Sequence, residues 1–215
     1  MYLPAHFNQP DGEVIRRLIR EAPMATLVTS LAGVPEANHL PMLLASDAEP
    51  MRLRFHVARA NPVWRETDPG SEVLAIFQGP DTYISPSWYA TKAEHGKVVP
   101  TWNYAVVHVY GRLEVHDDKE WLRNFLPSLT DAHEARFDAP WQVTDAPLDY
   151  VDKMMAAIVG MELSVTRVVA KWKLGQNQPA ANRSTLLAGL RQADQPGAKA
   201  VADLLDAHLR GTPGG

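Results

Sequence analysis

The chain has 215 residues and a mass of 23.8 kDa, enough to bury a substantial core as one domain or as one domain with a small appendage. With 46% apolar and 21% charged residues it has the composition of a globular protein, and no stretch reaches the roughly 18 to 20 apolar residues of a membrane span. A net charge of -4 gives no whole-molecule attraction to nucleic acid. Cysteine is absent and residues 1–7 lack the basic start of a signal peptide, which favours the cytoplasm.

The first part of the chain reads as one helix followed by strands. Asp11 is placed to cap a helix whose apolar stripe runs from Val14 to Ala22. Residues 51–57 alternate between apolar and polar, so His56 is expected to point with the arginines, away from the core. The predicted strands are 25–30, 38–44, 51–57 and 73–78, and a turn at Ala32-Gly33 joins the first two as a hairpin.

The second part mixes long strands with helices. Residues 103–116 are long enough for a bent strand, with Gly111 as the candidate bend. A strand from Met161 changes its inward face near Thr166-Arg167, as at a β-bulge or barrel corner. Helices are predicted at 121–129, 150–159, 185–190 and 198–209, with a loop at 138–147 and a flexible tail at 211–215.

About six strands with irregularly inserted helices favour a small closed or split β-barrel over a doubly wound sheet. The chain has no G-x-G-x-x-G or P-loop motif, so a nucleotide is not expected on a Rossmann or P-loop helix. It also lacks H-E-x-x-H and G-x-S-x-G, and no catalytic residue or metal site is predicted.

Two segments set large aromatic side chains beside hydroxyls and amides in sequence interrupted by proline. They are residues 83–89 and 99–104, and they are typical of a loop surface that holds a flat ligand with a polar edge. A third segment, residues 56–64, supplies a guanidinium, an amide and an indole, which suit a phosphorylated ligand. A ring together with a phosphate indicates a nucleotide-like cofactor.

These three segments, together with residues 1–7 and 173–177, resemble the PaiB-like FMN-binding negative transcriptional regulator family, over roughly residues 1 to 190. The resemblance implies a mixed α+β, mainly β fold: an FMN-binding split β-barrel similar to pyridoxamine phosphate oxidase, with peripheral helices. It also implies a homodimer with flavin sites at the subunit interface. We expect the barrel domain to cover residues 1–175, and a helical extension with a flexible tail to cover 176–215.

Arg59 is the first candidate for the FMN phosphate, because a guanidinium makes bidentate contacts with a dianion, with Asn61 donating beside it and Trp64 walling the pocket. Asn61-Pro62 is equally a good helix start, and both interpretations can hold because a helix N-terminus attracts anions. The other residues predicted to bind the cofactor are Asn38, His39, Leu40, His56, Ala58, Ser85, Trp88, Thr101, Trp102, Asn103, Lys171, Lys173, Gln176 and Asn177.

Several of these residues have an alternative structural interpretation. Residues 38–40 also fit an ordinary barrel strand, and Trp88 and Trp102 fit core or interface packing. Lys171 and Lys173 fit the phosphate of the partner subunit's flavin, or equally a solvated strand edge blocked by lysines.

Three functions remain open at this point. The first is an FMN-binding negative transcriptional regulator that acts indirectly through flavin or ligand sensing; direct DNA binding has little support, since no helix-turn-helix or basic stretch is visible. The second is an FMN-dependent oxidoreductase that passes electrons between NAD(P)H and a small substrate. The third is a flavin-free dimeric binding module that handles haem, with His39, His56 and His95 as conceivable axial ligands.

Overall fold

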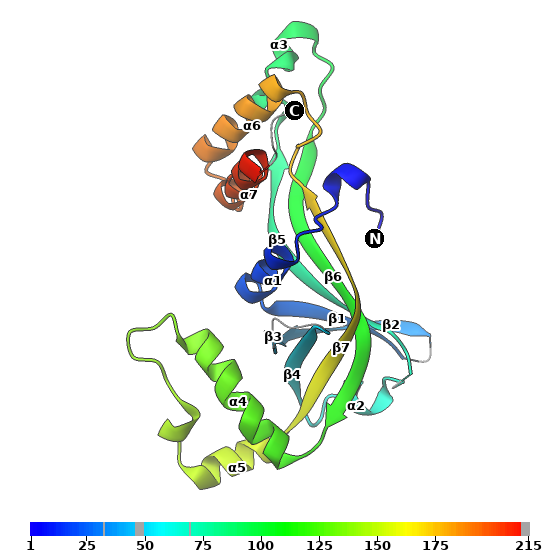
Figure 1. Ribbon diagram of the computed structural model, residues 1–215, viewed down its shortest axis with the longest axis vertical. Coiled ribbons are helices and arrows are strands. Elements are labelled where there is room, and N and C mark those ends of the chain that lie inside the picture. Colours follow the sequence, from blue (N-terminus) through cyan, green and yellow to red (C-terminus); the bar gives the residue numbers. More distant parts are fainter. Residues whose placement is uncertain (32, 46–49, 69, 212–215) are drawn as a thin grey trace. The chain divides into compact units, whose positions relative to one another are not determined.

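The computed structural model describes residues 1–31, 33–45, 50–68 and 70–211 (Figure 1). Ala32 of the predicted turn and residues 212–215 of the predicted tail lie outside the described residues. The chain forms two compact units, which we describe separately. The first unit contains Met1–Ile15, Gln78–Val107 and Val169–Gly215, and the second contains Arg16–Phe77 and His108–Val168. None of the described helices is both long and apolar enough to cross a membrane.

Seven strands make up the sheet of the described residues, in the order β2-β1-β5-β6-β7-β4-β3. Their bounds are β1 Met24–Leu31, β2 Val34–Pro41, β3 Leu43–Leu44, β4 Arg52–Ala58, β5 Val73–Ile84, β6 Thr101–His116 and β7 Ile158–Lys173. Strand β1 pairs antiparallel with β2 and β5, and β4 pairs antiparallel with β3 and β7. Strands β2 and β3 lie at the two ends of this order, so the described sheet is not closed into a barrel. The prediction of a mainly β, mixed α+β fold is confirmed.

The predicted hairpin and the first helix form as local sequence dictates. Strands β1 and β2 are in register from Met24↔Pro41 to Leu31↔Val34, and Gly33 in the connection has a φ of 83°, which a glycine adopts without strain. Helix α1, Gly12–Glu21, begins where the Asp11 carboxylate accepts the backbone N–H groups of Glu13 and Val14 at 2.9 and 3.2 Å.

Strands β4 and β7 build much of the core of the second unit. Leu53, Phe55 and Val57 of β4 are at most 2% exposed, as their alternation predicts. Strand β7 has two buried stretches separated by exposed Thr166 and Arg167, at the predicted change of face. It passes from the second unit to the first at the next residues, Val168 and Val169.

The helices after α1 are divided between the two units. Helices α4, Lys119–Glu134, and α5, Leu148–Ala156, belong to the second unit, together with the short helix α2, Val63–Glu66, and the 3-10 turn η3, Val143–Asp145. The first unit holds the 3-10 turns η1, Ala5–Phe7, and η2, Pro86–Trp88, and the helices α3, Thr91–His95, α6, Ala180–Gln192, and α7, Ala198–Gly211. Figure 1 shows α6 and α7 side by side, and α6 also contacts η2.

Two local predictions differ from the structure. Residues 101–104 are the beginning of β6 and not a loop, because strand pairing overrides the break that Pro100 introduces. His56 does point with the arginines of β4, but its ring is only partly exposed and lies 6.4 Å from the ring of Phe125 on α4. Helix α4 therefore covers the face of β4 that the alternation alone leaves to water.

Candidate functional site

The predicted cofactor-binding residues are divided between the two units. The second unit holds Asn38, His39, Leu40, His56, Ala58, Arg59, Asn61 and Trp64. The first unit holds Ser85, Trp88, Thr101, Trp102, Asn103, Lys171, Lys173, Gln176 and Asn177. Each group has its own geometry, and each is described within its own unit.

Arg59 is held by an acid and by backbone carbonyls. Its Nη1 and Nη2 donate to the Asp117 carboxylate at 3.0 and 2.6 Å, and its Nε and Nη2 donate to the carbonyls of Ala156 and Ile158 at 2.8 and 3.1 Å. The hydrogen bonds from Arg59 hold the pKa of Asp117 below its usual value. One N–H on Nη1 has no partner among the described residues. The guanidinium is thus fixed in place with one donor to offer, and phosphate contact stays a prediction.

Asn61 caps a helix and also reaches a second asparagine. Its Oδ1 accepts the backbone N–H of Val63 at 2.9 Å at the start of α2, which confirms the interpretation as a helix start. Its Nδ2 donates to Oδ1 of Asn38 at 2.7 Å. The Nδ2 of Asn38 is buried and has no hydrogen-bond partner in the part of the chain that the structure describes. A buried donor without a partner is costly, so this amide is suited to a bound acceptor.

Strand β2 offers backbone groups beside that amide. It is an end strand that pairs only with β1 among the described strands, so the other edge of Asn38, His39 and Leu40 has no strand partner there. The His39 Nδ1 lies 3.1 Å from Thr26 Oγ1. Edge N–H and C=O groups together with the Asn38 amide fit the polar edge of an isoalloxazine ring. When bound, a flavin supplies hydride or electron transfer, which no side chain of the chain provides.

A pocket of about 470 Å³ lies beside Trp64 in the second unit. The Trp64 Nε1 donates to the Arg59 carbonyl at 3.1 Å, and the Arg65 guanidinium carbon lies 4.1 Å from the centre of the indole. Residues that line this pocket include Trp64, Arg65, Leu113, His116 and Met161. The sequence analysis did not select Arg65 or His116 as site residues. The one available signal for Arg65 was that a cation directly follows Trp64.

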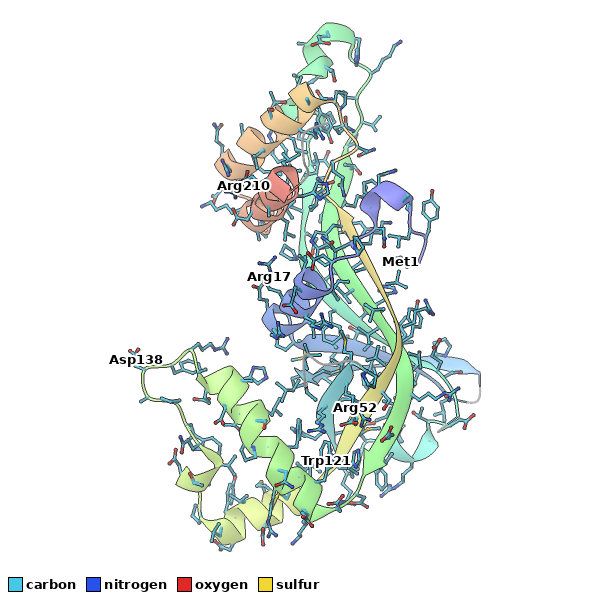
Figure 2. The ribbon with its side chains drawn as sticks, in the orientation of Figure 1. Met1, Arg17, Arg52, Trp121, Asp138 and Arg210 are labelled. Atoms are coloured by element: carbon cyan, nitrogen blue, oxygen red, sulfur yellow. The ribbon has the colours of Figure 1, made fainter. Side chains whose placement is uncertain are left out.

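A buried acid lies on β7, opposite Arg54 of β4. The side chain of Glu162 is 2% exposed and binds Arg52 Nη1 and Arg54 Nε, each at 2.6 Å (Figure 2 labels Arg52). Burial alone would raise the pKa of Glu162, but the hydrogen bonds and charges of Arg54 and Arg52 outweigh it and lower the pKa. Burial lowers the pKa of His56, whose Nδ1 has no partner among the described residues. Ala58, at the end of β4, contributes only its carbonyl, which accepts the Asn61 N–H at 2.8 Å.

In the first unit, Lys173 and Asn103 share a cavity of about 160 Å³. Lys173 Nζ donates to Thr101 Oγ1 at 2.5 Å and to the Trp102 carbonyl at 2.9 Å. Asn103 is 1% exposed, and neither atom of its amide has a partner in the described chain. Burial lowers the pKa of Lys173, with a smaller opposing effect from Tyr104 and a further lowering by the charge of Lys171. The structure therefore brings Thr101, Asn103 and Lys173 together.

Lys171 differs from a lysine that blocks a strand edge. It is 8% exposed, and its Nζ donates to the Tyr2 carbonyl at 3.2 Å. The rings of Tyr2, Phe7 and Tyr104 have centres 5.8, 5.9 and 5.4 Å from this nitrogen. The interpretation as a solvated edge lysine is wrong for Lys171, because aromatic rings surround the ammonium group.

Other predicted residues of the first unit make structural contacts. Trp88 packs against α6, where a Cβ at Gly189 would lie 2.5 Å from the indole Cγ, and the Ser85 hydroxyl accepts the Ser87 N–H at 3.2 Å. The Gln176 amide donates to the carbonyls of His6 and Trp172 at 3.0 and 2.6 Å.

Trp102 and Asn177 are more exposed. The Trp102 indole is 50% exposed and donates to Asp81 at 2.9 Å, and Asn177 lies on the rim of the cavity that contains Asn103. Flavin contact by these residues stays a prediction.

Solved structures share this fold. The chain matches the "FAD and Heme binding protein from Mycobacterium smegmatis" with a TM-score of 0.58 and 18% identity, over 85% of this chain and 80% of that one. It matches the "Flavocytochrome Anf3 from Azotobacter vinelandii" with a TM-score of 0.52 and 18% identity, over 80% and 72% of the two chains. The chain therefore shares its fold with these two proteins.

The sequence shows the family to which the chain belongs. The family model described as "Putative FMN-binding domain" matches residues 1–167, so the chain belongs to this family. "Protease synthase and sporulation protein PAI 2" of Bacillus subtilis is 32% identical over 212 residues, which cover 98% of this chain and 99% of that protein. The chain is a PaiB-like FMN-binding protein, and its cofactor is FMN or a related flavin.

Proposed function

We propose that this protein is a flavin-responsive negative regulator of transcription that acts indirectly. The observation that carries the flavin part is the buried Asn38 amide, whose Nδ2 lacks a partner beside the unpaired edge of β2 and the Arg59-Asn61-Trp64 segment. The regulatory part is supported by the similarity to a protein named for protease synthesis and sporulation. The expected target genes are accordingly those for extracellular proteases and sporulation.

An indirect action is favoured by charge. The chain carries 21 Lys and Arg against 25 Asp and Glu, and DNA binding without a basic face is weak at physiological salt. Arg52, Arg54 and Arg59 are paired with Glu162 and Asp117. They are thus not arranged as free contacts for a phosphate backbone.

The experiment combines a spectrum with a DNA-binding assay. The purified protein is loaded with FMN, desalted and scanned in the visible range, and its effect on a protease-gene promoter fragment is measured by gel shift at low salt. A retained two-banded flavin spectrum without a shift is the expected result. A colourless protein after loading would contradict flavin binding, and a specific shift would contradict indirect action.

An FMN-dependent NAD(P)H oxidoreductase is the second candidate, favoured by the pocket of about 470 Å³ beside Trp64. Its volume is within the range of small-molecule sites, and Arg65 on the indole would suit a phosphorylated nicotinamide. Steady oxidation of NADH or NADPH by the FMN-loaded protein with an added acceptor would support the oxidoreductase. If no acceptor gives oxidation, the flavin-responsive regulator is the function that stands.

We also propose a homodimer, with flavin sites that both subunits complete. Large apolar side chains lie exposed on the second unit, where a partner could cover them: Met24, Val34, Val115, Phe137, Trp141, Leu148, Tyr150 and Met154. Size-exclusion chromatography with light scattering tests the assembly. A monomer that still retains FMN would contradict a shared site.

A further inference from the structure

The cavity of the first unit contains polar groups whose hydrogen-bonding capacity is not met. Asn103 presents an amide oxygen and an amide nitrogen, both without a partner among the described residues, although it is 1% exposed. Lys173 has three N–H donors, and its two hydrogen bonds use two of them. Both residues line the same cavity of about 160 Å³, whose apolar lining includes Phe7, Tyr89 and Val99.

A second buried asparagine of the same unit has a purely structural role and serves as a comparison. Asn182 is 2% exposed, and its Oδ1 accepts the Thr91 N–H at 3.0 Å. Its Nδ2 donates to Thr91 Oγ1 at 3.0 Å and to Gln178 Oε1 at 3.2 Å. Asn103 has equal burial and none of these bonds. A buried amide without a partner among the described residues is suited to a bound molecule.

The charges of the cavity indicate which atoms that molecule presents. Lys173 makes no ion pair with a carboxylate in residues 1–31, 33–45, 50–68 or 70–211, and the charge of Lys171, a second cation, acts on it. The spare N–H of Lys173 is therefore available to an acceptor on the ligand. Asn103 Nδ2 requires another acceptor, and Asn103 Oδ1 requires a donor.

An acceptor, a donor and a second acceptor side by side form the edge of a cyclic imide. We propose that Asn103 and Lys173 form a recognition site for a one-ring planar imide, the chemistry of a pyrimidine-2,4-dione. The ligand N–H donates to Asn103 Oδ1, one carbonyl accepts from Asn103 Nδ2, and the other accepts from Lys173 Nζ. Phe7, Tyr89 and Val99 supply apolar contacts for the rest of the ring.

The size of the cavity separates two sources of this chemistry. The outer ring of an isoalloxazine carries the same imide edge, so a free one-ring imide and a flavin would present identical groups. A cavity of about 150 Å³ holds one benzene ring, so the cavity at Asn103, about 160 Å³, has room for one ring. We assign the free ligand, and FMN titrations distinguish it from the outer ring of a flavin.

The test is a calorimetric titration of the full-length protein, without FMN, with uracil. 1,3-Dimethyluracil, which lacks the imide N–H, serves as the ligand control, and benzoate tests a plain carboxylate. Asn103→Leu and Lys173→Met remove the two recognition groups; Lys92→Met, at a lysine of the same unit that binds Ser87 at 2.9 Å, is the matched control. FMN titrations of the same variants by flavin fluorescence run in parallel, so that failure of the flavin proposal is visible separately.

We expect uracil to bind, dimethyluracil and benzoate to bind at least tenfold more weakly, and each recognition variant to lose at least tenfold in uracil affinity. Lys92→Met should bind uracil as the wild type does. Absence of uracil binding, or preference for benzoate, overturns the proposal. A loss of FMN affinity in Asn103→Leu also overturns it, because the imide is then the outer ring of the flavin. Should Asn103→Leu not fold, Lys173→Met decides by the same criteria.

Discussion

The carboxylate of Asp117 accepts hydrogen bonds from both terminal nitrogens of Arg59, at 3.0 and 2.6 Å, in a bidentate pair. The same guanidinium is tied to two backbone carbonyls near the start of β7. This arrangement orients Arg59 before any ligand arrives, so little side-chain entropy is lost when the spare Nη1 N–H meets a phosphate.

Arg59→Ala is accordingly expected to weaken FMN binding by about 10- to 150-fold, the range for loss of a hydrogen bond to a charged group. Flavin-fluorescence titration measures the affinity, and circular dichroism checks that the variant is folded. Arg123→Ala is the matched control, since Arg123 pairs with Asp152 at 2.8 Å in the same unit and is not a predicted contact. Equal affinity in the wild type and Arg59→Ala would remove Arg59 from the site.

The buried Glu162 predicts a specific dependence of stability on pH. Its pKa in the folded protein is lowered from the usual 4.5, because the two arginines outweigh the effect of burial. The folded state therefore favours the carboxylate, and the stabilisation is fully present above about pH 4.5 and is lost as the pH falls through the lower folded value. Urea unfolding of the wild type should show a falling free energy of unfolding in that acidic range.

Glu162→Gln removes the charge and provides the comparison. At neutral pH we expect it to lower the free energy of unfolding by about 1 to 3 kcal/mol, since two arginines lose a charged partner but remain partly solvated. Its stability should change less than that of the wild type between neutral and acidic pH. Asp152→Asn, in an exposed pair, should have little effect. Parallel pH profiles for the wild type and Glu162→Gln would contradict this account.

Local patterns allowed much of the fold to be predicted. The alternation of Leu53, Phe55 and Val57 identifies β4, and the caps at Asp11 and Asn61 mark two helix starts, because each feature involves residues close in sequence. The open order of the sheet and the cover of α4 over His56 could not be predicted, because they depend on how distant segments pack.

The candidate site was less accessible from sequence for the same reason. The partners of Arg59 and Arg54 are Asp117 and Glu162, which lie 58 and 108 residues away along the chain. Asn103 was selected as a polar residue among aromatics, but its lack of partners is a property of the whole surrounding structure. Sequence identifies residue types suited to a ligand, and the three-dimensional structure shows which of them the fold leaves unsatisfied.

Gly111 was predicted to bend its strand. In the structure, this glycine allows β6 to lie close to β7. A Cβ at this position of β6 would collide with the carbonyl oxygen of Ser164 on β7. Backbone cannot move aside as a flexible side chain can, so Gly111→Ala should lower the free energy of unfolding by about 1 to 3 kcal/mol. Gly211→Ala, where a Cβ meets nothing within 4 Å, is the control and should be neutral in urea unfolding. Equal stability of both variants would show that β6 and β7 separate easily at this point.

The two buried asparagines of the first unit predict opposite effects of the same substitution. Asn182→Leu breaks bonds to Thr91 and Gln178 and leaves their groups buried without partners, so the free energy of unfolding should fall by about 1 to 3 kcal/mol. Asn103→Leu breaks no bond within the described chain and adds apolar surface next to a cavity, so stability should be unchanged or higher. Urea unfolding of the ligand-free protein measures both. If Asn103→Leu is as destabilising as Asn182→Leu, the Asn103 amide has a structural partner and the case for a ligand at this cavity is lost.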